Sequence, residues 1–191
     1  MGIYELPLRN FFIFDIVGIA SEEYSKNMPK VSEKKYKGVV LYLSGKIGGE
    51  IRGKKKLAKL LYFVDFDFFE KYQKSLTGDI YKALPMGPFP ATMEKILAEM
   101  VLEKKITVKF EKERFDFNPT EIYKAKEKAE DIFNKEERAV LDRVILKYGH
   151  LSGKQLEDLT HAEAPYIGTA PNQEIAYELA FYRGTNMDED A

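Results

Sequence analysis

The feature that most constrains the fold of this chain is a helical pattern in residues 54–69 that is apolar on several sides. One set of apolar residues recurs at helical spacing as a stripe, and a second set covers much of the remaining surface. The stripe is Leu57, Leu60, Leu61, Val64 and Phe68, and the second set is Ala58, Tyr62, Phe66 and Phe69. A helix of this kind is buried by its neighbours. The sequence therefore predicts a central helix around which the rest of the domain packs.

Composition limits the kind of protein. The 191 residues, 45% of them hydrophobic, suffice for one sizeable core. The 30 basic and 31 acidic residues leave a net charge of -1, so no overall field attracts nucleic acid or anionic lipid. The absence of cysteine excludes disulfides and cysteine nucleophiles and agrees with a reducing cytoplasm. The apolar run at residues 11–20 is too short for a bilayer span, which needs about 20 residues. We expect a cytoplasmic protein without a membrane partner.

The pattern around the central helix predicts a mainly helical α+β fold. Residues 32–45 form a helix before it, and residues 76–79 form a polar turn after it, followed by a short extended segment at 80–84. Pro88 and Pro90 have the positions that proline takes in the first turn of a helix, because amides there lack partners. We therefore expect the next helix to begin at these prolines.

The C-terminal half combines one β signal with several helices. Alternating apolar residues at 106–110 and again at 115–117 predict one antiparallel β-hairpin. We expect helices at 120–133, 134–148, 152–160 and 175–182, with a loop at 164–168. Asn134 with Glu137, and Ser152 with Gln155, have the spacing of capping boxes. The fold class is thus a compact helical domain with a small antiparallel hairpin.

The chain divides into three parts by pattern. Residues 1–30 form an N-terminal extension, residues 31–184 form the domain, and residues 185–191 form a flexible acidic tail. The extension includes the apolar run at 11–20, which we expect to pack on the domain or on a second copy of the chain.

No complete catalytic pattern is present. Histidine is the commonest general base and metal ligand, but the chain has only His150 and His161. His161 and Glu163 form the best local pair, yet they supply fewer ligands than a zinc site requires. We expect His161 to cap its helix or to hold the following loop by hydrogen bonds. Neither a nucleophile elbow nor a phosphate-binding loop occurs. We predict a protein that is not an enzyme and has no catalytic residue, metal site or cofactor.

Two features leave DNA binding open as an alternative. Lys54, Lys55, Lys56 and Lys59 would make a local positive patch at the start of the central helix. Residues 134–160 can also be drawn as a helix-turn-helix, although Glu157 and Asp158 in its second helix would face phosphates unfavourably. We expect solvated lysines and no nucleic-acid partner.

Asp65 is a carboxylate inside the aromatic helix and must be solvated or hydrogen-bonded. Lys59, Tyr62 and Phe66 follow one another on the same side of that helix. Two hypotheses remain open. Asp65 ties down the segment from Thr77 to Tyr81, or this side of the helix joins the loop at residues 87–88 in a pocket or partner surface.

Several separated motifs occur together in one order, and the combination is specific. They are Lys56-Leu57-Ala58-Lys59-Leu60-Leu61-Tyr62-Phe63, Leu76-Thr77-Gly78, Met86-Gly87-Pro88, Thr160-His161-x-Glu163-x-Pro165-Tyr166 and residues 175–182. With this order the chain, from Val31 to Arg183, resembles the Panacea domain family around the antitoxin SocA. The resemblance implies a compact, mostly helical domain with a small antiparallel β element and no catalytic residue.

The resemblance also implies a function. Members of the family are read as antitoxins or phage-associated proteins, and an antitoxin neutralises a toxin encoded beside it by direct contact. SocA itself resembles a proteolytic adaptor that delivers its toxin to a protease. We expect a cognate protein toxin as partner, with a protease complex and a homodimer as further assemblies. The expected partner surface comprises Lys59, Tyr62, Asp65, Tyr81, Gly87, Pro88, His161 and Tyr166.

Two other functions stay open beside it. One is a DNA-binding autoregulator of the protein's own operon, using Lys54 to Lys59 or residues 134–160. The other is a phage-associated, metal-assisted hydrolase around His161 and Glu163.

Overall fold

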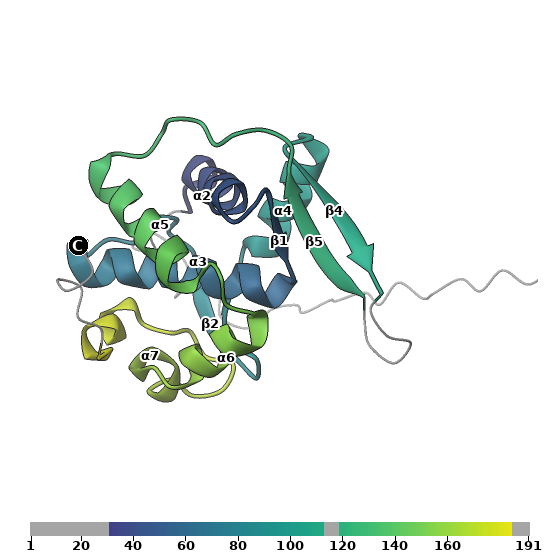
Figure 1. Ribbon diagram of the computed structural model, residues 1–191. Helices are drawn as coiled ribbons and strands as arrows, with labels where there is room; N and C mark the ends of the chain where they lie inside the picture. Colours follow the sequence, from purple (N-terminus) through teal and green to yellow (C-terminus); the bar gives the residue numbers. More distant parts are fainter. Residues whose placement is uncertain (1–30, 113–118, 185–191) are drawn as a thin grey trace, which may run out of the picture.

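The aromatic helix forms the centre of the molecule as α3 (Lys54–Tyr72) in a computed structural model that describes residues 31–112 and 119–184. The predicted extension at 1–30, the tail at 185–191 and Phe115 and Phe117 lie outside the described residues. In Figure 1, α2 (Glu33–Lys46) lies on one side of α3, and α6 (Gly153–His161), α7 (Ala164–Ile167) and the 3₁₀ helix η1 (Tyr177–Tyr182) lie on the other. The predicted mainly helical α+β class is confirmed.

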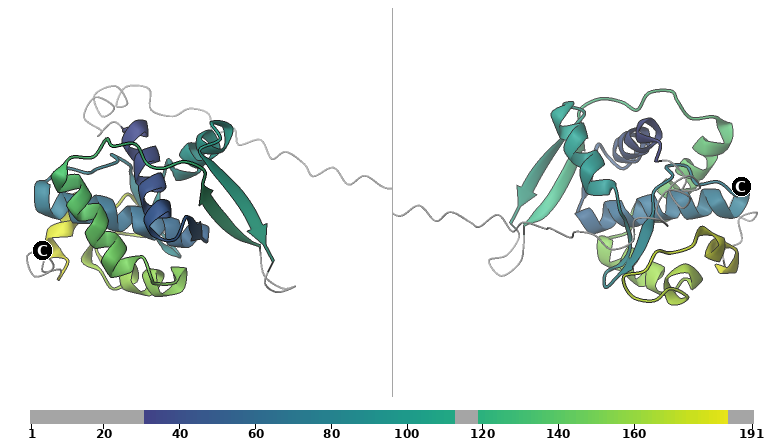
Figure 2. Two further views of the ribbon diagram at one scale, coloured as in Figure 1. Left: turned by 45° about the horizontal axis from the view of Figure 1, so that its top comes forward. Right: turned by 180° about the vertical axis from the view of Figure 1, so that it is seen from behind.

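The remaining elements cover the flanks and one end of α3. They are β1 (Glu50–Arg52), β2 (Tyr81–Leu84), β3 (Gly87–Pro90), α4 (Met93–Leu102), β4 (Ile106–Glu111), β5 (Thr120–Ala125) and α5 (Lys135–Tyr148). Figure 2 shows β4 and β5 standing at one end of α3 in both views. No helix of the described segments is long and apolar enough to cross a bilayer.

The core forms on both sides of α3, as its sequence pattern predicts. Leu57, Leu60 and Leu61 are fully buried, and so are the aromatic residues Tyr62, Phe63 and Phe66. Phe63 stacks on Tyr148 of α5 at 3.8 Å between ring centroids, and Phe66 stacks on Tyr177 at 4.7 Å. Each fully buried side chain of this size contributes about 1.5–3 kcal/mol. The aromatic excess of the helix therefore serves packing.

The larger sheet has the strand order β1-β5-β4 and is antiparallel throughout. It corrects two predictions. The first strand of the expected hairpin is confirmed as β4, but the return strand lies at 120–125, where we predicted a helix through residue 133. β5 is the central strand, and Ile122 and Tyr123 on its opposite faces are both buried. A strand buried on both faces lacks the alternation that identifies strands in a sequence.

Residues 126–134 contain no helix either and pass beside α2 as an irregular connection (Figure 1). Gly38 on α2 leaves room for them: a Cβ atom there would lie 2.7 Å from Ile132 Cδ1 and 3.0 Å from Phe133 Cζ. The short strand β1, which lies between Gly49 and Gly53, was not predicted.

The smaller sheet is the β2–β3 hairpin, and it corrects the prediction for the prolines. Pro88 and Pro90 lie in β3, and α4 begins only at Met93. On its other side β2 bonds to the segment at 172–175, with Ala83 N donating to Gln173 O at 2.9 Å. Because antiparallel residues alternate in the direction of their main-chain groups, both prolines fall at positions that face away from β2. Proline is tolerated there because no ladder hydrogen bond is lost.

The C-terminal helices follow their capping signals. Both predicted capping boxes are present, at the N-termini of α5 and α6. The predicted loop at 164–168 contains the one-turn helix α7, with Pro165 in its first turn. The predicted helix at 175–182 begins later, as η1 at Tyr177, because Ile175 N donates to Tyr81 O at 2.7 Å and is held in an extended conformation.

The α5 capping box should contribute measurably to stability. Asn134→Ala removes the acceptor for Glu137 N, so we expect the free energy of unfolding in urea to fall by about 1 kcal/mol. The control Asn134→Ser keeps an oxygen at the cap and should retain most of that stability. Equal losses in the two variants would contradict the capping role.

Candidate functional site

Asp65 lies fully buried inside α3 and fixes the segment that follows the helix. Its carboxylate accepts hydrogen bonds from Leu76 N at 2.8 Å, Thr77 N at 2.7 Å and Thr77 Oγ1 at 2.5 Å. Tyr81 Oη donates to it at 2.8 Å. Burial raises the pKa of Asp65 to about 6, although these donors favour the charged form. The first of the two hypotheses for Asp65 is therefore confirmed: it ties down the segment from Thr77 to Tyr81.

Asp79 continues this network toward the next elements. Its side chain accepts from Ile80 N at 2.8 Å and from Thr92 N, just before α4, at 3.1 Å. Its main-chain carbonyl accepts from Tyr177 Oη at 2.6 Å. Burial raises the pKa of Asp79. The two carboxylates and the main-chain carbonyl of Asp79 thus connect α3, the start of α4 and η1 through one short segment.

Lys59 holds the β2–β3 hairpin against α3. Its side chain is buried, with 1% of the residue surface exposed, and Nζ donates to Pro88 O at 2.7 Å. The backbone approaches this amine closely at Gly87, where a Cβ atom would lie 2.7 Å from Nζ and where φ is +89°. Burial lowers the pKa of Lys59 to about 7, although the nearby Glu157 opposes the shift. Position 87 requires glycine for two reasons: a Cβ atom would collide with the Lys59 amine, and a positive φ is unfavourable for other residues.

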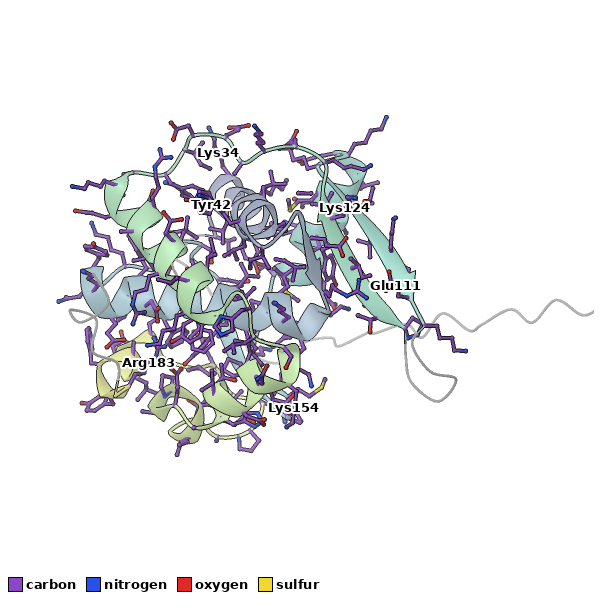
Figure 3. All side chains as sticks on the ribbon, viewed as in Figure 1. Lys34, Tyr42, Glu111, Lys124, Lys154 and Arg183 are labelled. Carbon is purple, nitrogen blue, oxygen red and sulfur yellow. The ribbon has the colours of Figure 1, made fainter. Side chains whose placement is uncertain are left out.

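A buried ionic network joins the C-terminal segment to α3. Arg183 Nη2 contacts Glu163 Oε1 at 2.7 Å, and its Nη1 contacts Asp67 Oδ1 at 2.8 Å. Tyr62 Oη donates to Glu163 Oε2 at 2.8 Å, and Arg143 also pairs with Asp67. Burial opposes the charge of Arg183, but the carboxylates outweigh it and raise its pKa. Figure 3 shows Arg183 below α3, beside the C-terminal elements.

Sequence reasoning missed this ionic network. Asp67, like Asp65, is a carboxylate in an aromatic helix. This signal could have predicted a partner for Asp67, because a buried carboxylate must be paired or hydrogen-bonded. Its partners Arg183 and Arg143 are distant in the sequence, and nothing in their own neighbourhood indicated burial.

His161 and Tyr166 form the edge of the site. Their rings stack at 4.4 Å between centroids with an interplanar angle of 19°, and both residues are half-buried. Tyr166 Oη donates to Leu84 O at 2.9 Å, which joins α7 to the hairpin. His161 was expected to act by hydrogen bonds, but His161 Nε2 has no such partner among the described residues. His161 instead packs against the ring of Tyr166.

The structure brings the predicted site residues together but buries most of them. We use the name α3 framework for Lys59, Tyr62, Asp65, Tyr81, Gly87 and Pro88, which are all buried. They connect α3 with the hairpin, with the segment at 76–81 and with Glu163. Only His161 and Tyr166 keep part of their surface exposed. The α3 framework positions this edge and does not itself form an exposed surface.

The lysines considered for DNA binding have internal partners. Lys54 pairs with Glu94 at 2.9 Å and with Glu121 at 3.2 Å, and Lys55 pairs with Glu157. Lys56 Nζ donates to Gly149 O at 2.7 Å. These contacts correct the expectation that the lysines at the start of α3 are solvated, and they leave little free positive charge for phosphates.

The metal-site hypothesis finds no ligand cluster in the part of the chain that the structure describes. No group of at least three His, Cys, Asp or Glu residues there could hold a metal ion. Glu163, the predicted partner of His161, is engaged by Tyr62 and Arg183. The arrangement at this site is suited to holding segments together.

The chain was compared with models of known protein families. Residues 57–166 match the family model described as antitoxin SocA-like, Panacea domain. The matched range begins in α3 and ends in α7, so it contains the whole α3 framework together with His161 and Tyr166. It leaves out α2 and η1, which the resemblance in the sequence had included. Searches of curated proteins and of solved structures found no match.

The low pKa of Lys59 should make stability depend on pH. In the unfolded chain its pKa is about 10.4, so between pH 7 and 10 the unfolded state binds more protons than the folded state. Stability should therefore rise with pH in this range, by up to about 1.4 kcal/mol per pH unit from this group. Lys59→Met should lose that rise in urea unfolding between pH 6 and 9. The exposed control Lys95→Met should keep it, and parallel curves for wild type and Lys59→Met would contradict the assignment.

The ionic network should be sensitive to loss of its cation. Arg183→Met leaves Asp67 and Glu163 buried with less compensation, and we expect a loss of about 3–5 kcal/mol in the free energy of unfolding. Arg183→Lys keeps the charge without the planar fork and should lose less. Denaturant unfolding measures both, and a loss below about 1 kcal/mol for Arg183→Met would be inconsistent with the network.

Proposed function

We infer the function of this chain from the family to which it belongs, the antitoxin SocA-like Panacea domain family. Membership supports an antitoxin-like function in general, and an antitoxin needs a protein partner. We propose that the chain neutralises a cognate protein toxin in the cytoplasm by direct contact. The family match carries this proposal. The charged groups of the site hold segments of the domain together, which keeps the surface above them in one conformation. This supports the proposal, because binding is favoured by a preformed surface.

The proposed contact surface is the edge that the α3 framework positions. His161 and Tyr166 contribute partly exposed rings, and aromatic rings are enriched at protein interfaces. Ile167 directly follows Tyr166 in the sequence and is 69% exposed. Met86, in the turn of the hairpin two residues after Leu84, is 60% exposed. Tyr166 Oη joins α7 to the hairpin at Leu84 O. The buried residues of the α3 framework therefore act on the toxin indirectly, by fixing this edge.

Delivery of the toxin to a protease is an extension of this proposal. An adaptor needs a second contact, with the protease complex, in addition to the contact with the toxin. The half-life of the toxin separates the two forms of neutralisation. Simple binding leaves the half-life unchanged or longer, and delivery shortens it in a way that depends on the protease.

Co-expression with the product of the neighbouring gene tests the proposal. That product should arrest growth alone, and this chain should restore growth. The double variant His161→Ala and Tyr166→Ala should weaken toxin binding at least about tenfold, because interface aromatics carry much of the binding energy. Leu146→Ala, at an exposed position on α5, is the matched control and should bind normally. A harmless neighbour, or toxicity that persists beside the wild-type chain, would refute the antitoxin function.

A further inference from the structure

An apolar groove runs between α4 and the strands β4 and β5. Its volume is about 710 Å³. Leu102 and Phe110, on its two sides, are 81% and 68% exposed, and Val101 is 41% exposed. Its other apolar residues are Leu97, Ala98, Val108 and Tyr123. Contiguous exposed apolar surface on a monomeric protein usually marks a contact site.

The strand beside this groove also has a free edge. The order β1-β5-β4 leaves one side of β4 without a partner strand in the part of the chain that the structure describes. An unpaired edge presents main-chain donors and acceptors that readily bond another strand. The groove and the edge together fit an extended apolar segment, whose main chain pairs with β4 and whose side chains enter the groove.

The sequence of residues 11–17, Phe-Phe-Ile-Phe-Asp-Ile-Val, is apolar apart from one carboxylate. Aromatic and β-branched residues of this kind favour strands. The intervening residues 18–30 can span roughly 40 Å when extended. α2, which follows them, contacts α4 directly: Glu33 pairs with Lys95 at 3.2 Å and Lys37 with Glu99 at 2.9 Å. The tether therefore reaches the groove, and a tethered segment has an effective concentration that an untethered partner rarely matches.

Charge indicates which side of the segment faces the groove. In any extended strand of this sequence, Asp15 would face the side opposite to Phe12, Phe14 and Ile16, because successive side chains alternate. The outer face of the sheet carries Lys109, and Lys124 lies on the same face opposite Thr107. A carboxylate is favourable beside these lysines and costly inside the groove.

We propose that residues 11–17 add to the edge of β4 and fill this groove, with Phe12, Phe14 and Ile16 inward and Asp15 outward. The segment then covers an apolar surface that would otherwise be open to a second copy of the chain. This intramolecular contact is independent of the proposed toxin binding at His161 and Tyr166, and either one can fail without the other.

The absence of cysteine makes disulfide trapping a direct test in the full chain. Phe14→Cys combined with Leu102→Cys places one thiol in the segment and one in the groove. Phe14→Cys combined with Leu146→Cys is the control, because Leu146 is 79% exposed on α5. Under mild oxidation at low protein concentration, the groove pair should form an intramolecular disulfide at least about tenfold faster than the control. Equal rates would overturn the proposal, and disulfides between chains would assign the groove to a second copy.

Hydrogen exchange provides a measurement that needs no new cross-link. In the full chain, Phe12→Asp with Phe14→Asp should expel the segment. The β4 amides that point away from β5 should then exchange at least about tenfold faster, because they lose their partners. Amides of α5 should be unaffected. Unchanged exchange in β4 would overturn the strand addition.

Discussion

The burial of the Asp65 carboxylate inside the central helix is the constraint on which the arrangement of this protein depends. A carboxylate in an aromatic core is tolerated only when hydrogen-bond donors surround it. Here the donors are the main chain and side chain of Thr77, the amide of Leu76 and the hydroxyl of Tyr81. Leu76 and Thr77 belong to the segment between α3 and the hairpin, and Tyr81 is the first residue of the hairpin strand β2. Satisfying one charge therefore determines where the chain goes after the helix.

The need of buried charged groups for partners also explains how α5, the C-terminal segment and the hairpin are attached to α3. Asp67 pairs with Arg183 and Arg143 and so holds the C-terminal segment and α5 against α3. Lys59 donates a hydrogen bond to the carbonyl of Pro88 and so holds the hairpin. The polar groups of α3 thus each hold a different segment. This structural use of charge explains why titratable groups with shifted pKa values gather here. Shifted pKa values are common at active sites, but structural ion networks produce them too.

Much of the helical framework could be predicted from the sequence, because its signals are local. The apolar pattern located α3, and both capping boxes located the starts of α5 and α6. The errors have tertiary causes. Pro88 and Pro90 fit either a helix start or a strand whose amides face away from its partner, and only the pairing of β2 decides between them. β5 lacks a clear alternation because Ile122 and Tyr123, on its opposite faces, are both buried.

For the site, the sequence identified residues that meet in space but could not show that most of them are buried. Lys59 is charged and Tyr62 carries a hydroxyl group, and their polar atoms find partners only in the hairpin and in Glu163, which are distant in the sequence. The family explains why a binding function fits such a site. In the proposed function, the contact surface is the edge at His161 and Tyr166, which the buried α3 framework positions.

A double-mutant cycle between Asp65 and Tyr81 tests most directly whether the buried carboxylate organises this arrangement. Asp65→Ala, Tyr81→Phe and the double variant would be unfolded in urea, and the coupling energy would be taken from the four stabilities. A direct hydrogen bond to a buried carboxylate predicts a favourable coupling of about 1–3 kcal/mol. A coupling close to zero would show that the two side chains contribute independently and that Asp65 does not hold the segment in place.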